Sequence, residues 1–492
     1  MSDQKQIKIG WASISLVSDR PVLLAGQMYY RVSRYVHDPV TATAVAFDNG
    51  DASCIMVSCD MVGISDVIYD LLCKEVDGYH GFSSKNLTCG AIHSHNNSRF
   101  TPGDAHRSDF DDYIGEDKCL KMDIPDNILA GDESTRFWLD HVSQIIKEAW
   151  DIRKPGAISV AHDYASVAFN RRPVFQNPDG TEFSKMYGTC SNDNFIRFEG
   201  SSDHSADMLY TFDLEGNVTG VLVDIPCPSQ IMELHYFVSA DYWHYARGHI
   251  REKLGKNVYV LPICGPAGDQ NPIDLVRVSK VNQQELVEWN AQAGEVWCNY
   301  DLGAECDDTG SRIADAVERG YKKARNTIRT SVVMKESVLE IKLPIRKVSK
   351  ADYEEAVKIL DAKKKLFSPE HRMTSSDQVS MFEPIGVIKR WELQNKQKNY
   401  TFKSNVIRIG DAVFASNPFE LFVEYSFRIK ARAKAQNIFL MQLTNGVGGY
   451  LPTKAALAGG SYSSKPASTV VGPDEGTELC EIQIKAIDDL MK

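Results

Sequence analysis

Hydrophobic and polar positions along the chain follow two different periods, one typical of strands and one typical of helices. Short apolar runs bounded by turn residues predict strands over residues 52–64, 86–92, 157–170, 257–263, 331–348 and 437–444. Two further runs predict hairpins, 209–225 turning at 214–217 and 406–416 turning at 410–411. Apolar residues at helical spacing predict helices over residues 132–153, 311–328, 351–367 and 478–491, and another helix follows residue 420.

This alternation predicts an α/β fold, with a mixed β-sheet core and surrounding helices. The sequence has no internal repeat and no low-complexity linker, so we expect one unit over residues 1–492, with helical insertions at about 280–330 and 350–400. In the helix at 132–153, we expect Trp138, Val142 and Ile152 to face inward and Asp132 or Ser134 to cap the start.

Five of the strand-like runs end in polar or Gly/Pro-rich loops that carry residues suited to metal binding or catalysis. In α/β folds, sites form at the carboxyl ends of strands, so these loops could share one site. The clearest is a core strand that ends in two histidines, which are common metal ligands. The candidate residues are His93, His95, Cys227, Asp269, Asn271, Glu420 and Tyr450.

Composition narrows the class of partner. The chain has 492 residues, 43% of them hydrophobic and 25% charged, as in ordinary soluble proteins. A net charge of −11 and a pI near 5.6 argue against nucleic acid or an anionic membrane as the main partner. We find no signal peptide and no run long enough to span a bilayer.

The 11 cysteines are scattered, odd in number and without a Cys-x-x-Cys pair, and several lie inside apolar runs. This pattern indicates reduced, buried thiols and favours a cytoplasmic location.

Taken in order, the loops resemble motifs of the catalytic domain of the neutral ceramidases, a family of zinc amidases. The family's T-H-T-H-S-G-P element is similar to residues 92–96, which implies that His93 is a zinc ligand and that His95 lies beside the metal. Its N-R-S element is similar to residues 170–172, which points to Arg171 as a substrate contact.

At two positions the chain departs from the family. Its H-P-T element is similar to residues 227–229, so the zinc-binding histidine is replaced by Cys227. Its G-D-V-S-P element resembles residues 268–272, so the serine proposed to be catalytic is replaced by Asn271, with Asp269 conserved beside it. His235 is the alternative to Cys227 for completing a metal site.

The remaining motifs lie toward the C-terminus. The family's P-x-E-F element resembles residues 417–420 and makes Glu420 a ligand, while its tyrosine loop resembles residues 445–450 and makes Tyr450 a ligand. Tyr462 has the spacing of a second active-site tyrosine, and S-T-x-x-G-P matches residues 468–473. The chain ends before the family's C-terminal immunoglobulin-like domain.

The resemblance therefore implies zinc held by His93, Cys227, Glu420 and Tyr450, because zinc accepts nitrogen, thiolate and carboxylate donors. His95 or Asp269 would act as general base, and Arg171 with Tyr462 would hold the substrate. We expect a zinc-dependent hydrolase that cleaves an amide or ester bond of a polar small molecule. The polar run at residues 96–99 is expected to make one wall of the pocket polar. The sequence leaves the oligomeric state open.

Two other functions fit the same residues. The chain could be a glycan-processing enzyme on this scaffold, since aromatics such as Trp243 could stack on sugars. It could also be a non-catalytic relative that contains metal and binds a small molecule, because Asn271 replaces a serine.

Each residue also has a purely structural explanation. Cys227 could be a buried thiol, and residues 269–272 could form only an Asx turn. Glu420 could simply occupy the first turn of a helix, and Tyr450 and Tyr462 could be ordinary half-buried aromatics.

Overall fold

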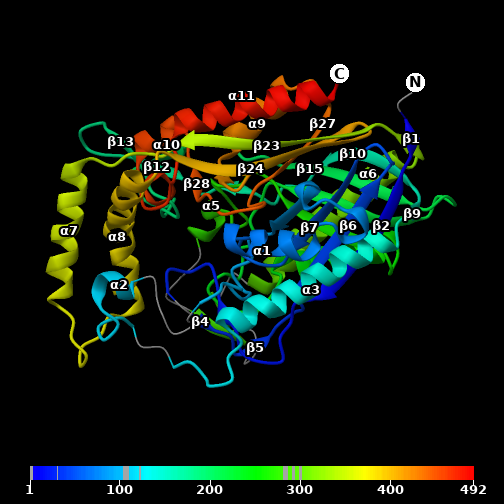
Figure 1. Ribbon diagram of the computed structural model, residues 1–492. Helices are drawn as coiled ribbons and strands as arrows, with labels where there is room; N and C mark the ends of the chain where they lie inside the picture. Colours follow the sequence, from blue (N-terminus) through cyan, green and yellow to red (C-terminus); the bar gives the residue numbers. More distant parts are fainter. Residues whose placement is uncertain are drawn as a thin grey trace.

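The structure is a computed structural model that describes residues 4–29, 31–103, 110–120, 123–280, 286–290, 294–297 and 302–492. Its helices lie around three larger β-sheets, which confirms the expected α/β class with a mixed sheet core (Figure 1). The start of the expected insertion at about 280–330 lies largely outside the described residues.

The first sheet has five strands and is covered on one face by two helices. Its strand order is β8 (Leu87–Ala91), β7 (Ser53–Cys59), β6 (Thr41–Asp48), β2 (Lys8–Ser15) and β9 (Lys154–Pro155). Helices α1 (Asp66–Val76) and α3 (Gly131–Asp151) lie over that face and share its apolar core (Figure 1). Trp138 and Val142 of α3 are fully buried, as their helical spacing predicts.

The expected start of α3 is wrong in detail. The helix begins after Ala130, and no side chain caps it; Asp132 lies in the first turn, where its charge favours the helix dipole. Ile152 lies just beyond the last turn and is half exposed, because the helix ends one residue earlier.

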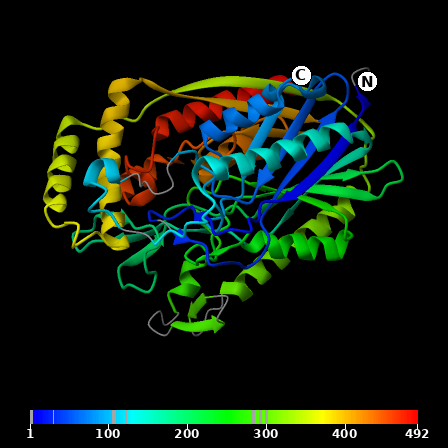
Figure 2. The same cartoon turned by 60° about the horizontal axis from the view of Figure 1, so that its bottom comes forward.

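The second sheet has four strands in the order β10 (Ala157–Tyr164), β15 (Ser205–Phe212), β16 (Val218–Ile225) and β18 (Tyr259–Cys264). The expected hairpin forms β15 and β16, and β18 pairs parallel to β16. Helices α4 (Tyr242–Leu254) and α6 (Leu302–Ala324) bury their apolar side chains against this sheet and appear together at the lower edge of Figure 2.

The third sheet has the order β23 (Met334–Pro344), β24 (Asn399–Ile409), β25 (Ala412–Ser416) and β27 (Asn437–Met441), with β25 and β27 parallel. Helices α9 (Val423–Arg432) and α11 (Pro473–Leu490) cover it. An apolar cluster with side chains from all three sheets, including Trp11, Leu222 and Phe439, joins them into one core.

A helical hairpin stands at one side of the sheets, on the left in Figure 1. It comprises α7 (Lys350–Lys364) and α8 (Ser375–Lys396), and with the short helix α2 (Asp111–Ile114) it has its own apolar cluster. The sequence predicts α7 at residues 351–367. It gives no residue-level signal for α8, which contains Pro384 and has no apolar stripe.

The carboxyl ends of the parallel strands meet, as expected from their loops. Gly90 forms an isolated β-bridge with Thr444, and the backbone amide of Gln442 donates to the carbonyl of Cys264. These bonds hold the ends of β8, β18 and β27 close together. Among the helices in the described part of the chain, none has the length and hydropathy needed to cross a membrane.

Candidate active site

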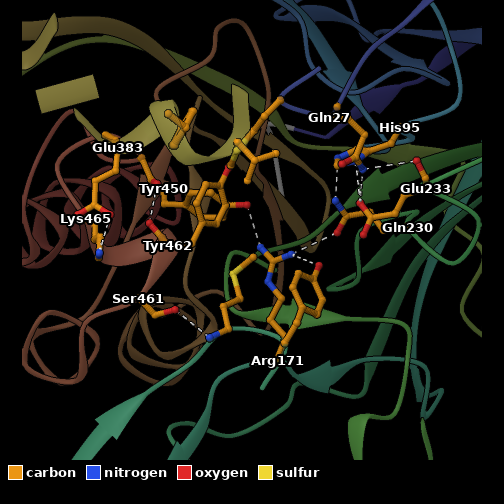
Figure 3. Close-up of a pocket in the computed structure, with 18 residues that line it drawn as sticks. Gln27, His95, Arg171, Gln230, Glu233, Glu383, Tyr450, Ser461, Tyr462 and Lys465 are labelled. Carbon is orange, nitrogen blue, oxygen red and sulfur yellow. Dashed lines mark hydrogen bonds and ion pairs between the residues drawn. The ribbon is translucent and has the colours of Figure 1, made fainter. Parts of the chain in front are cut away.

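Two adjoining cavities, of about 470 and 530 Å³, open over these strand ends. Their shared lining includes His95, Tyr450 and Tyr462 from the strand-end loops and Phe382 from α8 (Figure 3). His93 and Glu420 line the larger cavity, and Arg171 lines the smaller one.

His93 is held as a neutral imidazole with a fixed tautomer. Its Nδ1 lies 2.8 Å from the carbonyl oxygen of Val62, which can only accept, so Nδ1 carries the proton and Nε2 carries the lone pair. Burial, with a smaller contribution from His95, lowers the pKa of His93 well below its usual value. The backbone at His93 is left-handed, with φ of 63°, so the chain changes direction there, just after the end of β8.

Glu420 faces that lone pair. Its Oε2 lies 3.4 Å from His93 Nε2 and 3.9 Å from an Arg171 nitrogen. Burial raises the pKa of Glu420, and the Arg171 charge opposes this rise. Glu420 lies in β26 (Glu420–Leu421), before the N-cap of α9 at Phe422, so its structural explanation as a first-turn helix residue is wrong.

Arg171 is almost fully buried and orients the tyrosines of the site. Its Nη2 donates to the Tyr450 hydroxyl at 3.0 Å, and its Nη1 donates to the Tyr187 hydroxyl at 3.0 Å. Since Tyr450 accepts from Arg171, its own O–H remains available as a donor. The rings of Tyr450 and Tyr462 pack edge to face with centroids 5.5 Å apart.

His95 lies between a carboxylate and an amide (Figure 3). Glu233 Oε2 is 2.8 Å from His95 Nδ1, and Gln230 Nε2 is 2.7 Å from His95 Nε2. The Nε2 atoms of His95 and His93 are 3.4 Å apart. His95 therefore shares the site with His93, as the family resemblance implies.

Asp269, expected as a possible base, has a different environment. One carboxylate oxygen accepts from the Val423 amide at 3.0 Å, and the other accepts from the Asn170 side chain at 3.0 Å. Asp269 does not appear in the lining of either cavity, and both its oxygens hold loops together. The structure thus gives it a scaffolding position and leaves His95 as the base candidate.

Asn271 is buried and uses both ends of its side chain. Its Oδ1 accepts from the Ile273 amide at 2.8 Å, which is an Asx turn, and its Nδ2 donates to the Tyr187 hydroxyl at 3.0 Å. Asn271 therefore forms the Asx turn of its structural explanation, and it also contacts the site through Tyr187.

Cys227 was expected beside His93, but it lies in the core under the second sheet. Its thiol contacts the Val167 carbonyl at 3.2 Å, and neither cavity includes it. Apolar surroundings raise the pKa of Cys227, so they favour the neutral thiol over the thiolate that binds zinc. His235, the alternative, packs against Phe237 and likewise lines neither cavity.

The side chains of the site supply some, but not all, of the ligands that a metal ion needs. Within the described ranges, no group of three or more His, Cys, Asp or Glu side chains is arranged to hold a metal. His93 Nε2 and Glu420 Oε2 nevertheless have the separation expected for two ligands of one tetrahedral zinc, about 3.4 Å for bonds of about 2.1 Å. Tyr450, which contacts the same Arg171 side chain as Glu420, is a further oxygen donor in the site.

The expected polar wall is wrong. Asn96 and Asn97 turn inward and donate to backbone carbonyls, those of Phe237 and Asp60 among them, so only Arg99 of residues 96–99 lines a cavity. One wall is instead apolar and includes Phe382 and Val379 of α8. Such a wall suits a substrate that carries an apolar group.

Sequence reasoning missed Gln230, Glu233 and Tyr187. The first two directly follow the loop at residues 227–229, so their position after a core strand was an available signal. Tyr187 lies outside the loops that the sequence singled out, three residues after the short strand β13 (Glu182–Ser184), and its backbone there is left-handed, with φ of 57°.

The sheets, and the cavity at their shared strand ends, define a neutral-ceramidase-like fold. The chain superposes over 99% of its length on neutral ceramidase from Pseudomonas aeruginosa, with a TM-score of 0.66, 13% identity and 74% of that chain covered. It matches a ceramidase complexed with C2 over 99% of its length, with a TM-score of 0.66, 12% identity and 75% of that chain covered. No family model and no curated protein sequence matches the chain.

Proposed function

We propose that the chain is a metal-dependent hydrolase that cleaves an amide or ester bond in a small molecule with a polar reacting end. The observation that carries this proposal is the pair formed by His93 and Glu420. A neutral imidazole whose lone pair is fixed toward a buried carboxylate supplies two donors of the kinds that zinc accepts. The fold resemblance to the ceramidases supports the reaction class.

The chain's own residues suit acyl hydrolysis. His93 and Glu420 would hold the metal, with Tyr450 beside them; when bound, zinc would polarise the scissile carbonyl and make a water more acidic. His95 would take the proton of the attacking water and return it to the leaving group. Tyr450 would donate its O–H to the developing oxyanion, held in place by Arg171.

Tyr462 and the α8 wall would hold the substrate. Burial raises the pKa of both Tyr450 and Tyr462, so both remain hydrogen-bond donors at neutral pH. The apolar side chains of Phe382 and Val379 would contact an acyl or alkyl group, while the polar end lies against His95.

The test is hydrolysis of a panel of N-acyl amino acids and short-chain esters, before and after chelation and zinc addition. Turnover that chelator abolishes and zinc restores is expected. The His93→Ala variant should lose it, whereas His141→Ala, on the partly exposed face of α3, should keep it. Turnover that survives both chelation and the His93→Ala substitution would refute the proposed metal dependence.

A second candidate is a binding protein without catalysis. The observation in its favour is that Asn271, at the place of the family's serine, has both ends of its side chain occupied. Tight binding of a panel member, with metal bound and no turnover, would favour this function.

A further inference from the structure

We propose that Glu233 is a positioning residue, which holds His95 as the Nδ1-protonated tautomer and so keeps the Nε2 lone pair, which accepts from Gln230 in this structure, on the side of the site. This inference deepens the proposed function, since it concerns the group that would act as base. It rests on two hydrogen bonds, from Arg171 to Gln230 and from Gln230 to His95, which assign the proton of His95, and on the short distance between Glu233 and His95 Nδ1.

The chain of bonds begins at Arg171. A guanidinium only donates, and its Nη1 lies 3.3 Å from Gln230 Oε1, so that atom of the amide is the oxygen. The Gln230 NH₂ group then faces His95, 2.7 Å from Nε2, and it also only donates. His95 Nε2 must therefore accept, and in the neutral ring the proton lies on Nδ1.

Glu233 completes the pattern. Its carboxylate lies 2.8 Å from His95 Nδ1, with the oxygen off the axis of the N–H bond. Such loose alignment is common in sites without substrate and tightens when the substrate binds. Burial raises the pKa of Glu233, but contact with His95 and the charges of Arg171 and Arg31 together outweigh burial, so the pKa lies below its usual value.

The surroundings fix both partners. Gln27 donates to the Glu233 carboxylate at 3.3 Å. The buried Arg31 donates to the backbone carbonyls of both Glu233 and His95, each at 2.6 Å, so one guanidinium ties the two segments together. Gly26 packs against the His95 ring, where a Cβ would approach to 2.2 Å.

This arrangement accounts for the segment that follows Cys227. Where the family resemblance implies a ligand at residue 227, this chain turns that side chain into the core. Gln230 and Glu233, a few residues later, instead serve the neighbouring histidine. The segment still supplies polar groups to the site, but they act on His95 and not on the metal.

The test is to determine the tautomer of His95 from the ¹⁵N NMR signals of its ring nitrogens, in histidine-labelled protein at one fixed pH near 8.5. The His95→Asn spectrum identifies its signals among the 12 histidines. We expect protonated Nδ1 in the parent protein, and a partial shift toward protonated Nε2 in Glu233→Ala, in which only the Gln230 amide still favours the Nδ1-protonated form. The matched control is Glu252→Ala, which removes an exposed glutamate 3.4 Å from His249 and should leave the His95 signals unchanged.

Activity gives the second measurement. Glu233→Ala should lower kcat about 100-fold with little change in KM, and Glu233→Asp should restore part of it. An unchanged His95 tautomer in Glu233→Ala would overturn the positioning role, whatever the activity. A changed tautomer with unchanged kcat would support that role but would refute His95 as the base, and with it that part of the proposed function.

Discussion

At the scale of single residues, Arg172 connects the core to the loop that carries Tyr462. Its fully buried guanidinium forms an ion pair with Glu199 at 2.8 Å and donates to Ser463 at 3.0 Å. Arg172→Ala leaves Glu199 buried without its partner, so we expect a loss of about 3–5 kcal/mol in unfolding free energy, measured by urea denaturation. The exposed pair Arg197–Glu182 is the control, and Arg197→Ala should cost less than about 1 kcal/mol. Equal losses would contradict this account.

Asp224 predicts a pH dependence of stability. It is 1% exposed, its Oδ1 has no hydrogen-bond partner in the described part of the chain, and burial raises its pKa well above the usual range. The fold holds this proton to a higher pH than the unfolded chain does, so stability falls as pH rises above about 4. Asp224→Asn removes this loss, and its Tm should fall less than the parent Tm between about pH 5 and pH 8. Parallel Tm curves would contradict the assignment.

His93, His95, Glu420 and Tyr450 could be predicted from the sequence because they lie just after β8 or in the loops that follow β25 and β27, and parallel strands bring such ends together. Cys227 follows a core strand too. Sequence position gives the place of the backbone but not the side to which the side chain turns, and a thiol is stable in either environment.

At the scale of elements, α8 packs directly against the loop that carries Tyr462. A Cβ at Gly386 would lie 2.3 Å from the Ala467 Cβ. Gly386→Ala should destabilise the protein by about 1–3 kcal/mol despite a gain of about 1 kcal/mol in helix propensity, and it should raise KM by displacing the cavity wall. Thermal unfolding and steady-state kinetics measure both effects.

Gly248 in α4 is the matched control for Gly386. It is exposed, and a Cβ there would meet nothing within 4 Å, so Gly248→Ala should leave KM unchanged and stabilise the helix by up to about 1 kcal/mol. The same effect at both glycines would show that α8 does not fit closely against the site.

Elements with a clear hydrophobic period were predicted well: the bounds of α3 agree within two residues, and the β15–β16 hairpin was found with the start of β15 placed four residues late. Helix α8 was not, because its apolar side chains face both the α7 cluster and the cavity, which removes the single stripe that marks a surface helix.

At the scale of the whole molecule, three sheets bring loops from distant parts of the chain to one place, where His93 and Glu420 meet. The most direct test of this account is the metal content of protein purified without chelator. We expect about one zinc per chain in the parent and in Cys227→Ser, and close to none in His93→Ala and Glu420→Ala. Zinc that persists in both of the last two variants, or is lost only in Cys227→Ser, would contradict the account.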